Sequence, residues 1–323
     1  MSNTKLVVLV ITAVLVVCLV GAGVVLMIGG SFHSLFAGGT EVIIEEGQAL
    51  DVAGIKNINV HCVSGEIIIA AGAPRAELNG KIRTSQIKDN YLDVEKIGDT
   101  LSIRFDAGST FPGFLSGNVT MRIWLPEELA AHIDAQGTSA SINAQGLRFG
   151  NAKLKSVSGS VSLENCSGQT LEAETVSGAV SISGADFSDV WLRSISGAVS
   201  ARRLTGDLQL KSTSGALLIE QVAGEVKADN TSGSVAVLQP QQELMPISIE
   251  TISGSVELKL HPKAAFDLNL RTTSGGISTD FELLVSGSLK SSVIGRDTQG
   301  SVNGGGPEVG IKTISGGIRV MQQ

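Results

Sequence analysis

The sequence is poor in the residues that most often carry chemistry or stabilise small domains. Its 323 residues include only 3 cysteines, 4 histidines and 7 prolines, and aromatic side chains make up 4%. Charged residues account for 17%, which excludes a long disordered chain, because such chains combine high charge with low hydrophobicity. The net charge of −7 and the pI near 5.2 argue against a nucleic-acid partner, which would require a basic surface.

The few cysteines and histidines also follow no known spacing rule. The three cysteines form no disulfide framework or zinc motif, and no two histidines have the spacing of a metal-ligand pair. No phosphate-binding loop, dinucleotide fingerprint or glycine-rich calcium repeat occurs. We therefore expect no metal, no cofactor and no catalytic residue.

The first segment is a long apolar run. Residues 6–28 contain no charge and would form a helix of roughly 35 Å, which is enough to cross a bilayer. A cleavable signal peptide is the alternative, but its apolar core is shorter and ends in a small-x-small site. A lipoprotein would use Cys18, yet Val17 before it is not small. The run predicts an uncleaved transmembrane helix.

Flanking charge predicts the orientation of this helix. Lys5 precedes the run, and the next lysine or arginine is Lys56, whereas Glu41, Glu45 and Glu46 come earlier. Because positive charge stays on the cytoplasmic side, the N-terminus is predicted inside and the rest of the chain outside the cell membrane.

Glycine is abundant, with 39 residues, and much of it belongs to a repeat. Ten copies are centred on a Ser-Gly pair: Ser64-Gly65, Ser139-Ala140, Ser158-Gly159, Ser177-Gly178, Ser196-Gly197, Ser214-Gly215, Ser232-Gly233, Ser253-Gly254, Ser274-Gly275 and Ser315-Gly316. From position 140 to 275 the spacings are 19, 19, 19, 18, 18, 21 and 21. The gaps of 75 before and 41 after are close to four and two units. A period near 19 indicates a solenoid of stacked coils.

Alternating apolar residues within each unit predict β-strands. In one unit Ala152, Leu154, Val157, Val161 and Leu163 are expected to face inward, with a bend before the Ser-Gly pair. The third position of this series is held by Val176, Ile195 and Ile252 in other units. The glycine is also placed on the inward side, where only hydrogen fits close backbone packing or where φ must be positive. These structural glycines are Gly65, Gly159, Gly178, Gly197, Gly215, Gly233, Gly254, Gly275 and Gly316.

A ladder of small polar residues precedes each Ser-Gly pair. Its members are Cys62, Gly137, Ser156, Thr175, Ser194, Ser212, Asn230, Thr251, Thr272 and Thr313. We interpret this ladder as structural, with hydroxyl groups bound to backbone groups at the corner. Cys62 then takes the place of a serine.

Trp191 is the candidate contact residue. It lies between inward Val190 and Leu192 and should point outward, in a row that is otherwise polar or glycine: Asn59, Asp134, Lys153, Glu172, Gln209, Lys227, Ser248, Asn269 and Gly310. An exposed tryptophan in such a row is typical of a contact with a partner protein or glycan. The alternative is that Trp191 lies across a long neighbour such as Lys153.

The ordered set of motifs resembles a known family. The Thr/Val-Ser-Gly-x-Val repeats, the late Val285-Ser286-Gly287-Ser288-Leu289 and the run Gly304-Gly305-Gly306-Pro307 before Ile314-Ser315-Gly316 are similar to the toastrack domain, a family of candidate adhesins of bacteria and archaea. The resemblance covers roughly residues 41–321. It implies one β-solenoid on the envelope side of a membrane, with no established catalytic residues.

We therefore predict an all-β, single-stack β-solenoid preceded by one transmembrane helix. The expected segments are a cytoplasmic tail (1–5), the helix (6–28), a linker (29–40), irregular coils and a cap (41–132), the regular solenoid (133–279), and an insertion with a final coil, Val309 to Val320 (280–323).

Three functions remain open. The first is a non-enzymatic surface module that binds an envelope protein or a glycan, or assists an envelope-stress response. The second is a scaffold that polymerises by stacking solenoid ends. The third is a carbohydrate-active enzyme, although the mixed charges show no cluster of acids and bases.

Overall fold

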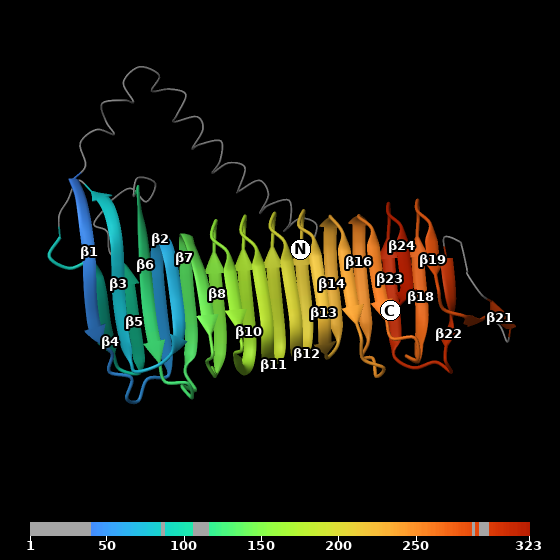
Figure 1. Ribbon diagram of the computed structural model, residues 1–323, viewed down its shortest axis with the longest axis horizontal. Coiled ribbons are helices and arrows are strands. Elements are labelled where there is room, and N and C mark those ends of the chain that lie inside the picture. Colours follow the sequence, from blue (N-terminus) through green and yellow to red (C-terminus); the bar gives the residue numbers. More distant parts are fainter. Residues whose placement is uncertain (1–39, 85–87, 106–115, 286–287, 291–296) are drawn as a thin grey trace, which may run out of the picture.

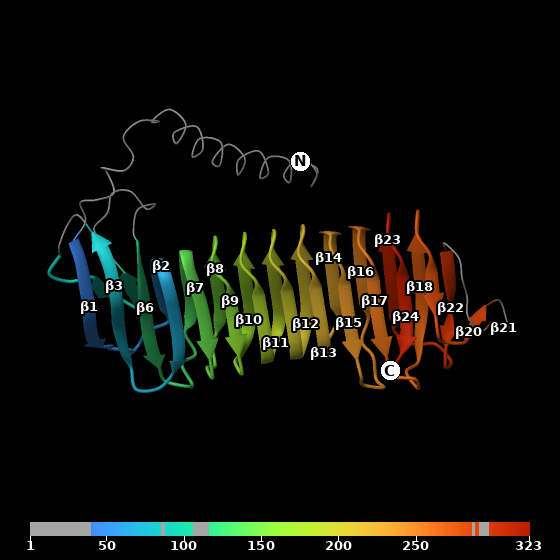
Figure 2. The ribbon, with the colours of Figure 1, turned by 45° about the horizontal axis from the view of Figure 1, so that its top comes forward.

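The structure is one long stack of short β-strands (Figures 1 and 2). This computed structural model describes residues 40–84, 88–105, 116–285, 288–290 and 297–323. The regular elements in these ranges are all strands, as expected, and none of their residues forms a helix that could cross a membrane. The predicted helix 6–28 and residues 1–5 and 29–39 lie outside the described ranges.

The strands form an N-terminal cap, a regular stack and a C-terminal end. The cap contains β1 (Thr40–Ala49), β3 (Arg75–Thr84), β4 (Leu92–Ile97), β5 (Thr100–Phe105) and β6 (Ser116–Leu125). The stack contains β2 (Asn57–Ala71), β7 (His132–Gln145), β8 (Asn151–Ser156), β9 (Val161–Glu164), β10 (Ser167–Thr175), β11 (Val180–Ser194), β12 (Val199–Ser212), β13 (Leu217–Ala223), β14 (Val226–Ser232), β15 (Val235–Gln239), β16 (Ile247–Ser253) and β17 (Val256–Leu260). The end contains β18 (Phe266–Thr272), β19 (Ile277–Thr279), β20 (Leu283–Val285), β21 (Ser288–Lys290), β22 (Asp297–Val302), β23 (Glu308–Thr313) and β24 (Ile318–Gln322).

Consecutive coils of the regular stack pair in parallel and in register. Leu171 lies between Ala152 of the coil before and Val190 of the coil after, 19 residues away on either side. Equivalent inward positions therefore form continuous ladders, and Leu154, Val161 and Leu163 have no measurable exposure. The stack has one uninterrupted apolar core between its two faces.

Five consecutive coils have a second bend, which follows the second strand of the coil and uses left-handed backbone. The residues at this bend are Gly146, Asn165, Gly184, Arg203 and Gln221, with φ between 50° and 66°. A left-handed residue bends the chain sharply at one position, which costs little for glycine or asparagine but is unusual for arginine and glutamine. The bends occur at the same 18–19-residue period as the Ser-Gly corners.

After the second bend, each of these coils has a short third segment that pairs with its neighbour, as Ala185 does with Leu204 and Leu204 with Val222. This row of segments ends at Val222. There the buried side-chain amide of Gln239 replaces a neighbouring strand: its Oε1 accepts from the Val222 N–H at 2.9 Å, and its Nε2 donates to the Val222 carbonyl at 3.2 Å. A glutamine amide has the same donor and acceptor pair as a backbone residue, so it satisfies an edge that would otherwise be buried and unpaired.

The expected inward position of Val157, Val176, Ile195 and Ile252 is wrong. Val157 and Ile252 are 48% and 50% exposed, and the other two are partly exposed. The buried series instead runs from Ala152 through Leu154 to Ser156, so the change of parity falls inside the corner. The hydroxyl side chain stays inside because the corner backbone supplies its hydrogen-bond partners.

The expected order of the coils is also wrong at the N-terminal end. β2 pairs directly with β7, with Gly65 opposite Ala140, so no coil lies between these strands although the two positions are 75 apart in the sequence. The chain instead leaves the stack after β2, builds the cap and returns. β5 and β6 pair in parallel with the outer edge of β2, whereas β1–β3, β3–β6 and β4–β5 are antiparallel.

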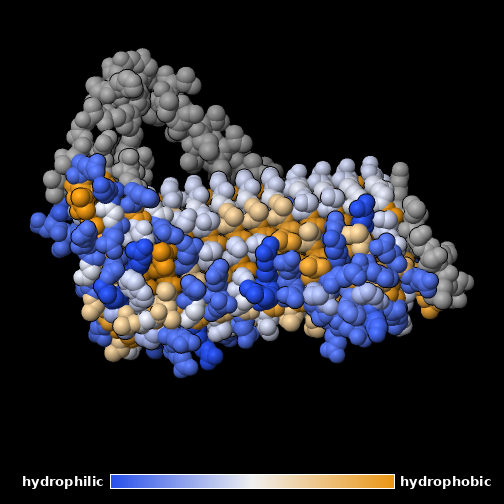
Figure 3. All heavy atoms as spheres, viewed as in Figure 1, coloured by the Kyte–Doolittle hydropathy of each residue, from blue (hydrophilic) through white to orange (hydrophobic). Residues whose placement is uncertain are grey.

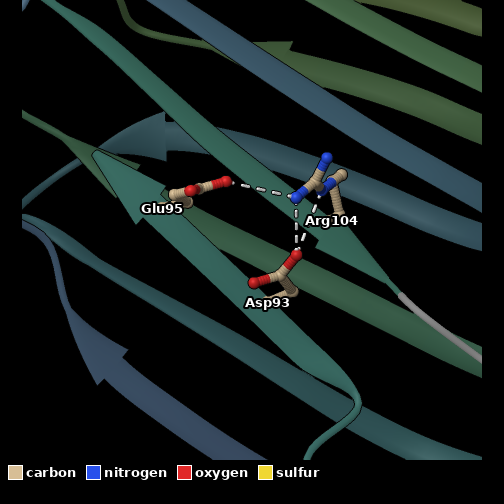
Figure 4. A network of polar contacts seen from close by, with 3 residues as sticks. All are labelled: Asp93, Glu95 and Arg104. Carbon is tan, nitrogen blue, oxygen red and sulfur yellow. Dashed lines mark hydrogen bonds and ion pairs between the residues drawn. The ribbon is translucent and has the colours of Figure 1, made fainter. Parts of the chain in front are cut away.

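The cap is joined partly by an ion-pair network (Figure 4). Arg104 on β5 donates to Asp93 on β4 at 2.8 Å and to Glu95 at 3.4 Å. All three side chains are about half exposed, so the network contributes little to stability by itself. Cross-strand pairs of this kind help to set the register of the β4–β5 hairpin.

The C-terminal end shows a second exchange of order. β23 lies between β16 and β18, and β24 lies between β17 and β19, so the last coil of the chain is not the last coil of the stack. Figure 1 shows these dark red strands inside the orange end. Beyond β18 on this side lies β22, which pairs antiparallel with it, and β20 and β21 follow outside β22. Both ends of the stack are thus built by a segment that extends outward before the chain returns.

Candidate functional site

The Ser-Gly corner is held by hydrogen bonds within and between coils. The Oγ1 of Thr175 accepts from the Gly178 N–H at 3.1 Å and donates to the Gly159 carbonyl of the preceding coil at 3.0 Å. Ser194 makes the same two bonds with Gly197 and Gly178. These buried hydroxyls satisfy backbone groups in an apolar core, so they are not free to act as nucleophiles.

The repeat glycines stack where two backbones approach closely. A Cβ built at Gly178, Gly197 or Gly215 would overlap the carbonyl oxygen of the corner residue in the preceding coil. Of the nine repeat glycines, Gly65 and Gly233 also have a positive φ, of 107° and 135°. Close packing is therefore the general reason for glycine, and backbone conformation adds to it at two positions.

The two described cysteines are buried and face no reactive partner. Cys62 lies in the corner ladder opposite Gly137, and its Sγ donates to the Ser64 carbonyl at 3.1 Å. Burial raises the pKa of the Cys62 thiol to about 11, and burial likewise raises the pKa of Cys166. A thiol that stays protonated is a poor nucleophile and a poor metal ligand.

The corners also form an uncharged rim along the stack. No acidic or basic side chain occurs at the four residues of each of these corners: 157–160, 176–179, 195–198, 213–216, 231–234, 252–255, 273–276 and 314–317. The upper rim in Figure 3 is correspondingly pale, whereas blue residues gather lower on the stack and at both ends. The charged chemistry of the regular coils therefore lies on the strands rather than at the corners.

Trp191 points outward from β11 and is 43% exposed. On the face formed by the first strand of each coil, it lies between Glu172 of the preceding coil and Gln209 of the next. We call this surface the Trp191 face. β11 is paired along both edges, so the backbone beneath the indole is held on each side.

Three shallow hollows adjoin the tryptophan. The first, of about 170 Å³, extends over Asp189, Asp207, Gln209, Glu225 and Lys227. The second, of about 390 Å³, reaches in the opposite direction to β2, and the third, of about 330 Å³, lies toward the corner. Trp191 lines all three, so it stands at their junction.

Charged residues on one side of Trp191 are already paired. Glu172 contacts Lys155 at 2.8 Å and Lys153 at 3.4 Å, and Lys155 also binds Glu174 at 2.9 Å. Partial burial raises the pKa of Glu172, but the hydrogen bonds and charges of the two lysines outweigh it, so its pKa is lowered overall. The same carboxylates outweigh desolvation at Lys155, so its pKa is raised overall.

Other polar groups around Trp191 are unpaired. Asp189, Gln209 and Arg193 make no side-chain hydrogen bond or ion pair with any residue that the structure describes. Asp189, Asp207 and Glu225 lie at equivalent positions on three successive coils. These three acids were not identified as candidates from the sequence alone. The signal was available, since the three acids recur at the repeat period two positions before the row of Trp191.

Nothing in the described ranges forms a metal centre. They contain no group of three or more histidine, cysteine, aspartate or glutamate side chains that could hold an ion. His132 on β7 lies opposite Asn57 on β2, and His61 on β2 lies opposite Gln136. His261 follows β17 near the other end. His33 lies outside the described residues.

The comparisons with known proteins concern the fold and not a ligand. The family model described as Toastrack DUF4097 matches residues 55–245, which is more than half of the chain. This chain belongs to the toastrack family. The match covers the regular coils that carry Trp191 and the acids of the three hollows, and it assigns no activity to them.

Three solved structures are similar over most of this chain. A candidate adhesin from Parabacteroides distasonis is 11% identical with a TM-score of 0.49, and the alignment covers 88% of this chain and 98% of that one. A candidate adhesin from Bacteroides fragilis is 13% identical, with a TM-score of 0.39 and coverage of 87% and 97%. A candidate cell adhesion protein from Clostridium sporogenes is 11% identical, with a TM-score of 0.25 and coverage of 87% and 100%. No curated protein matches the sequence.

Proposed function

We propose that this toastrack protein is a non-enzymatic binding module of the cell envelope that contacts its partner through the Trp191 face. The observation that carries the proposal is an exposed tryptophan at the junction of three hollows on a paired strand. Large aromatic side chains supply much contact area at little entropic cost, and they dominate many binding surfaces.

The apolar run at residues 6–28 supports attachment to the membrane. The distribution of charge on either side of this run supports a cytoplasmic N-terminus and an extracytoplasmic stack. In this arrangement protease added to intact cells would cleave the chain after residue 40, whereas protection of that region would overturn the proposed orientation.

The test of the binding face is site-specific photo-crosslinking in intact cells. A benzophenone side chain at position 209 lies beside Trp191. One at position 200, also on β12, points outward from the opposite face of the stack. We expect adducts from position 209 that decline with Trp191→Ala, and few from position 200. Equal labelling at the two positions, or labelling that ignores Trp191, would overturn the proposal.

A carbohydrate-active enzyme is the second candidate, because Asp189 and Asp207 stand opposite each other on adjacent strands. Adjacent parallel strands are about 4.8 Å apart, and retaining glycosidases use two carboxyl groups separated by about 5 Å. Release of reducing ends from a glycan, abolished by Asp189→Asn, would favour this function over simple binding.

A further inference from the structure

We infer that the ligand of the Trp191 face is an uncharged polysaccharide chain that lies along the stack axis, with one sugar ring on the indole. The inference rests on the proposed binding function and adds the chemical class of the ligand. The row of polar groups beside Trp191, the balance of charge and the shape of the hollows all favour such a ligand.

The outermost row of the Trp191 face contains no lysine or arginine. Its members on successive strands are Asn57, His132, Asn151, Thr170, Asp189, Asp207 and Glu225. Amide, hydroxyl and carboxylate groups can donate to or accept from sugar hydroxyls, and two oxygens of one carboxylate can accept from two neighbouring hydroxyls. Such a row offers hydrogen bonds at every coil along the axis.

Several of these groups have unused hydrogen-bonding capacity. Asn151 Oδ1 is buried and has no partner in the described structure, although it lines the second hollow. His132 Nδ1 accepts the Asn151 N–H at 3.1 Å, which leaves Nε2 to carry the proton of the neutral ring as a donor. Asp189 and Gln209 are unpaired beside the indole. A buried acceptor without a partner is costly, so a ligand hydroxyl at Asn151 would relieve that cost.

The charge of the lining favours an uncharged ligand. The three hollows together are lined by six carboxylates and four basic side chains. A polyanion would meet the carboxylates, and a basic peptide would meet Arg193, which is unpaired near Trp191. The apolar face of an uncharged sugar can stack on the indole without either penalty, while its hydroxyls reach the polar row.

The shape of the surface favours a linear chain. The hollows extend without a break in lining residues from β2 to β14, which spans six strand spacings or about 29 Å. None of them is a deep pocket for a compact small molecule. A chain crossing the strands would meet the same kinds of group at each coil, with Trp191 near the middle.

The test is a binding titration with the full chain in lipid nanodiscs. The chain has two tryptophans, so Trp124→Phe leaves Trp191 as the sole indole reporter. The probes are cello-, malto-, laminari-, chito- and mannohexaose, with hexagalacturonate and hexalysine as charged competitors. We expect saturable binding of at least one uncharged saccharide, reported by Trp191 fluorescence.

Variants measured by calorimetry show whether binding uses this face. Trp191→Ala and Asp189→Ala should each weaken binding about tenfold or more, whereas Ser200→Ala on the opposite face should leave it unchanged. Trp191→Phe should retain most of the affinity because a ring remains. Circular dichroism of each variant separates lost binding from lost fold.

The inference is overturned if none of the uncharged saccharides binds, or if Trp191→Ala leaves their binding unchanged. If hexalysine or hexagalacturonate binds instead, the class of ligand is wrong. If no saccharide binds but photo-crosslinking at position 209 still depends on Trp191, the proposed binding function is retained and only the class of ligand is wrong. If neither saccharide binding nor crosslinking is observed, the proposed function is wrong as well.

Discussion

At a corner glycine the nearest atom decides whether a methyl group is tolerated. Gly275 and Gly276 are neighbours in one corner and neither has a positive φ. A Cβ at Gly275 would overlap the Gly316 carbonyl oxygen, whereas a Cβ at Gly276 would meet nothing within 4 Å. We expect Gly275→Ala to lower the free energy of unfolding by about 1–3 kcal/mol and Gly276→Ala to leave it nearly unchanged, as measured by chemical denaturation. Equal losses would show that the corners are not closely packed.

The hydroxyl ladder allows a second matched pair. Thr175→Val keeps the shape of the side chain but removes both corner hydrogen bonds, so we expect a loss of about 1–3 kcal/mol in the free energy of unfolding. Thr251 lies in the same ladder, but its Oγ1 has no hydrogen-bond partner in the described structure. Thr251→Val should therefore be neutral or stabilising. A larger loss at Thr251 than at Thr175 would contradict the assigned bonds.

Cys62 should make stability depend on alkaline pH. Its thiol has a pKa of about 11 in the folded chain, against an ordinary value of 9.0. The folded state therefore holds the proton more tightly, and this contribution is present below about pH 9 and is lost as the pH rises toward 11. At about pH 10 the wild type should have lost about 1.4 kcal/mol relative to neutral pH through this residue. The loss is measured as the change with pH in the difference between wild type and Cys62→Ala. A difference that does not change with pH would show that the thiol is not buried as described.

At the scale of the elements, the last coil should support strands that precede it in the chain. β23 and β24 fill the space between the β16–β17 coil and the β18–β19 coil. A chain that ends at residue 306 would leave two unpaired parallel edges inside the stack. We expect hydrogen exchange to show lost amide protection across residues 266–279, although these residues are intact. Retained protection there would mean that the last coil is a dispensable outer layer.

The elements themselves could be predicted from the sequence, but their order could not. Alternating apolar residues and the repeat period identify strands because burial on one face imposes a period of two. The gaps of 75 and 41 residues are near multiples of the period, so spacing alone cannot distinguish intervening coils from an excursion and return. Only pairing between distant residues, such as Gly65 with Ala140, decides the order.

The repeat predicts which residues of the candidate site point outward, but not which of them pair with each other. Trp191 could be placed outward because its two neighbours are inward ladder residues. The neighbouring Asp189 and Asp207 could be aligned by the repeat, but which acids lack a partner depends on side-chain contacts. The hydroxyl of Ser156 was predicted to bind corner backbone groups, as it does, but its inward position was missed, because alternation placed Val157 inward instead.

At the scale of the whole molecule, the residues that stabilise the stack differ from the outward residues that form the candidate site. Each coil contacts its immediate neighbours, so stability should be close to a sum of coil and interface terms, with the two caps closing the ends. The uncharged corners and the small side chains within them permit close stacking, while the outward rows vary freely. A coil could then be lost from the regular region without loss of the fold.

Deletion of residues 208–225 tests this property. It removes one 18-residue unit and joins Asp207 to Val226, which takes the place of Leu208 beside Val190. Gln239 would then reach Leu204, the equivalent of Val222, and again close the edge of the third segment. We expect a folded chain whose unfolding remains cooperative and whose longest dimension, measured by small-angle scattering, is shorter by about 4.8 Å.

Deletion of residues 75–92 removes the same length but takes away β3, which pairs with both β1 and β6, so the cap should be lost. If the two deletions unfold the chain equally, the coils are not interchangeable units, and the Trp191 face depends on the whole stack rather than on its neighbours.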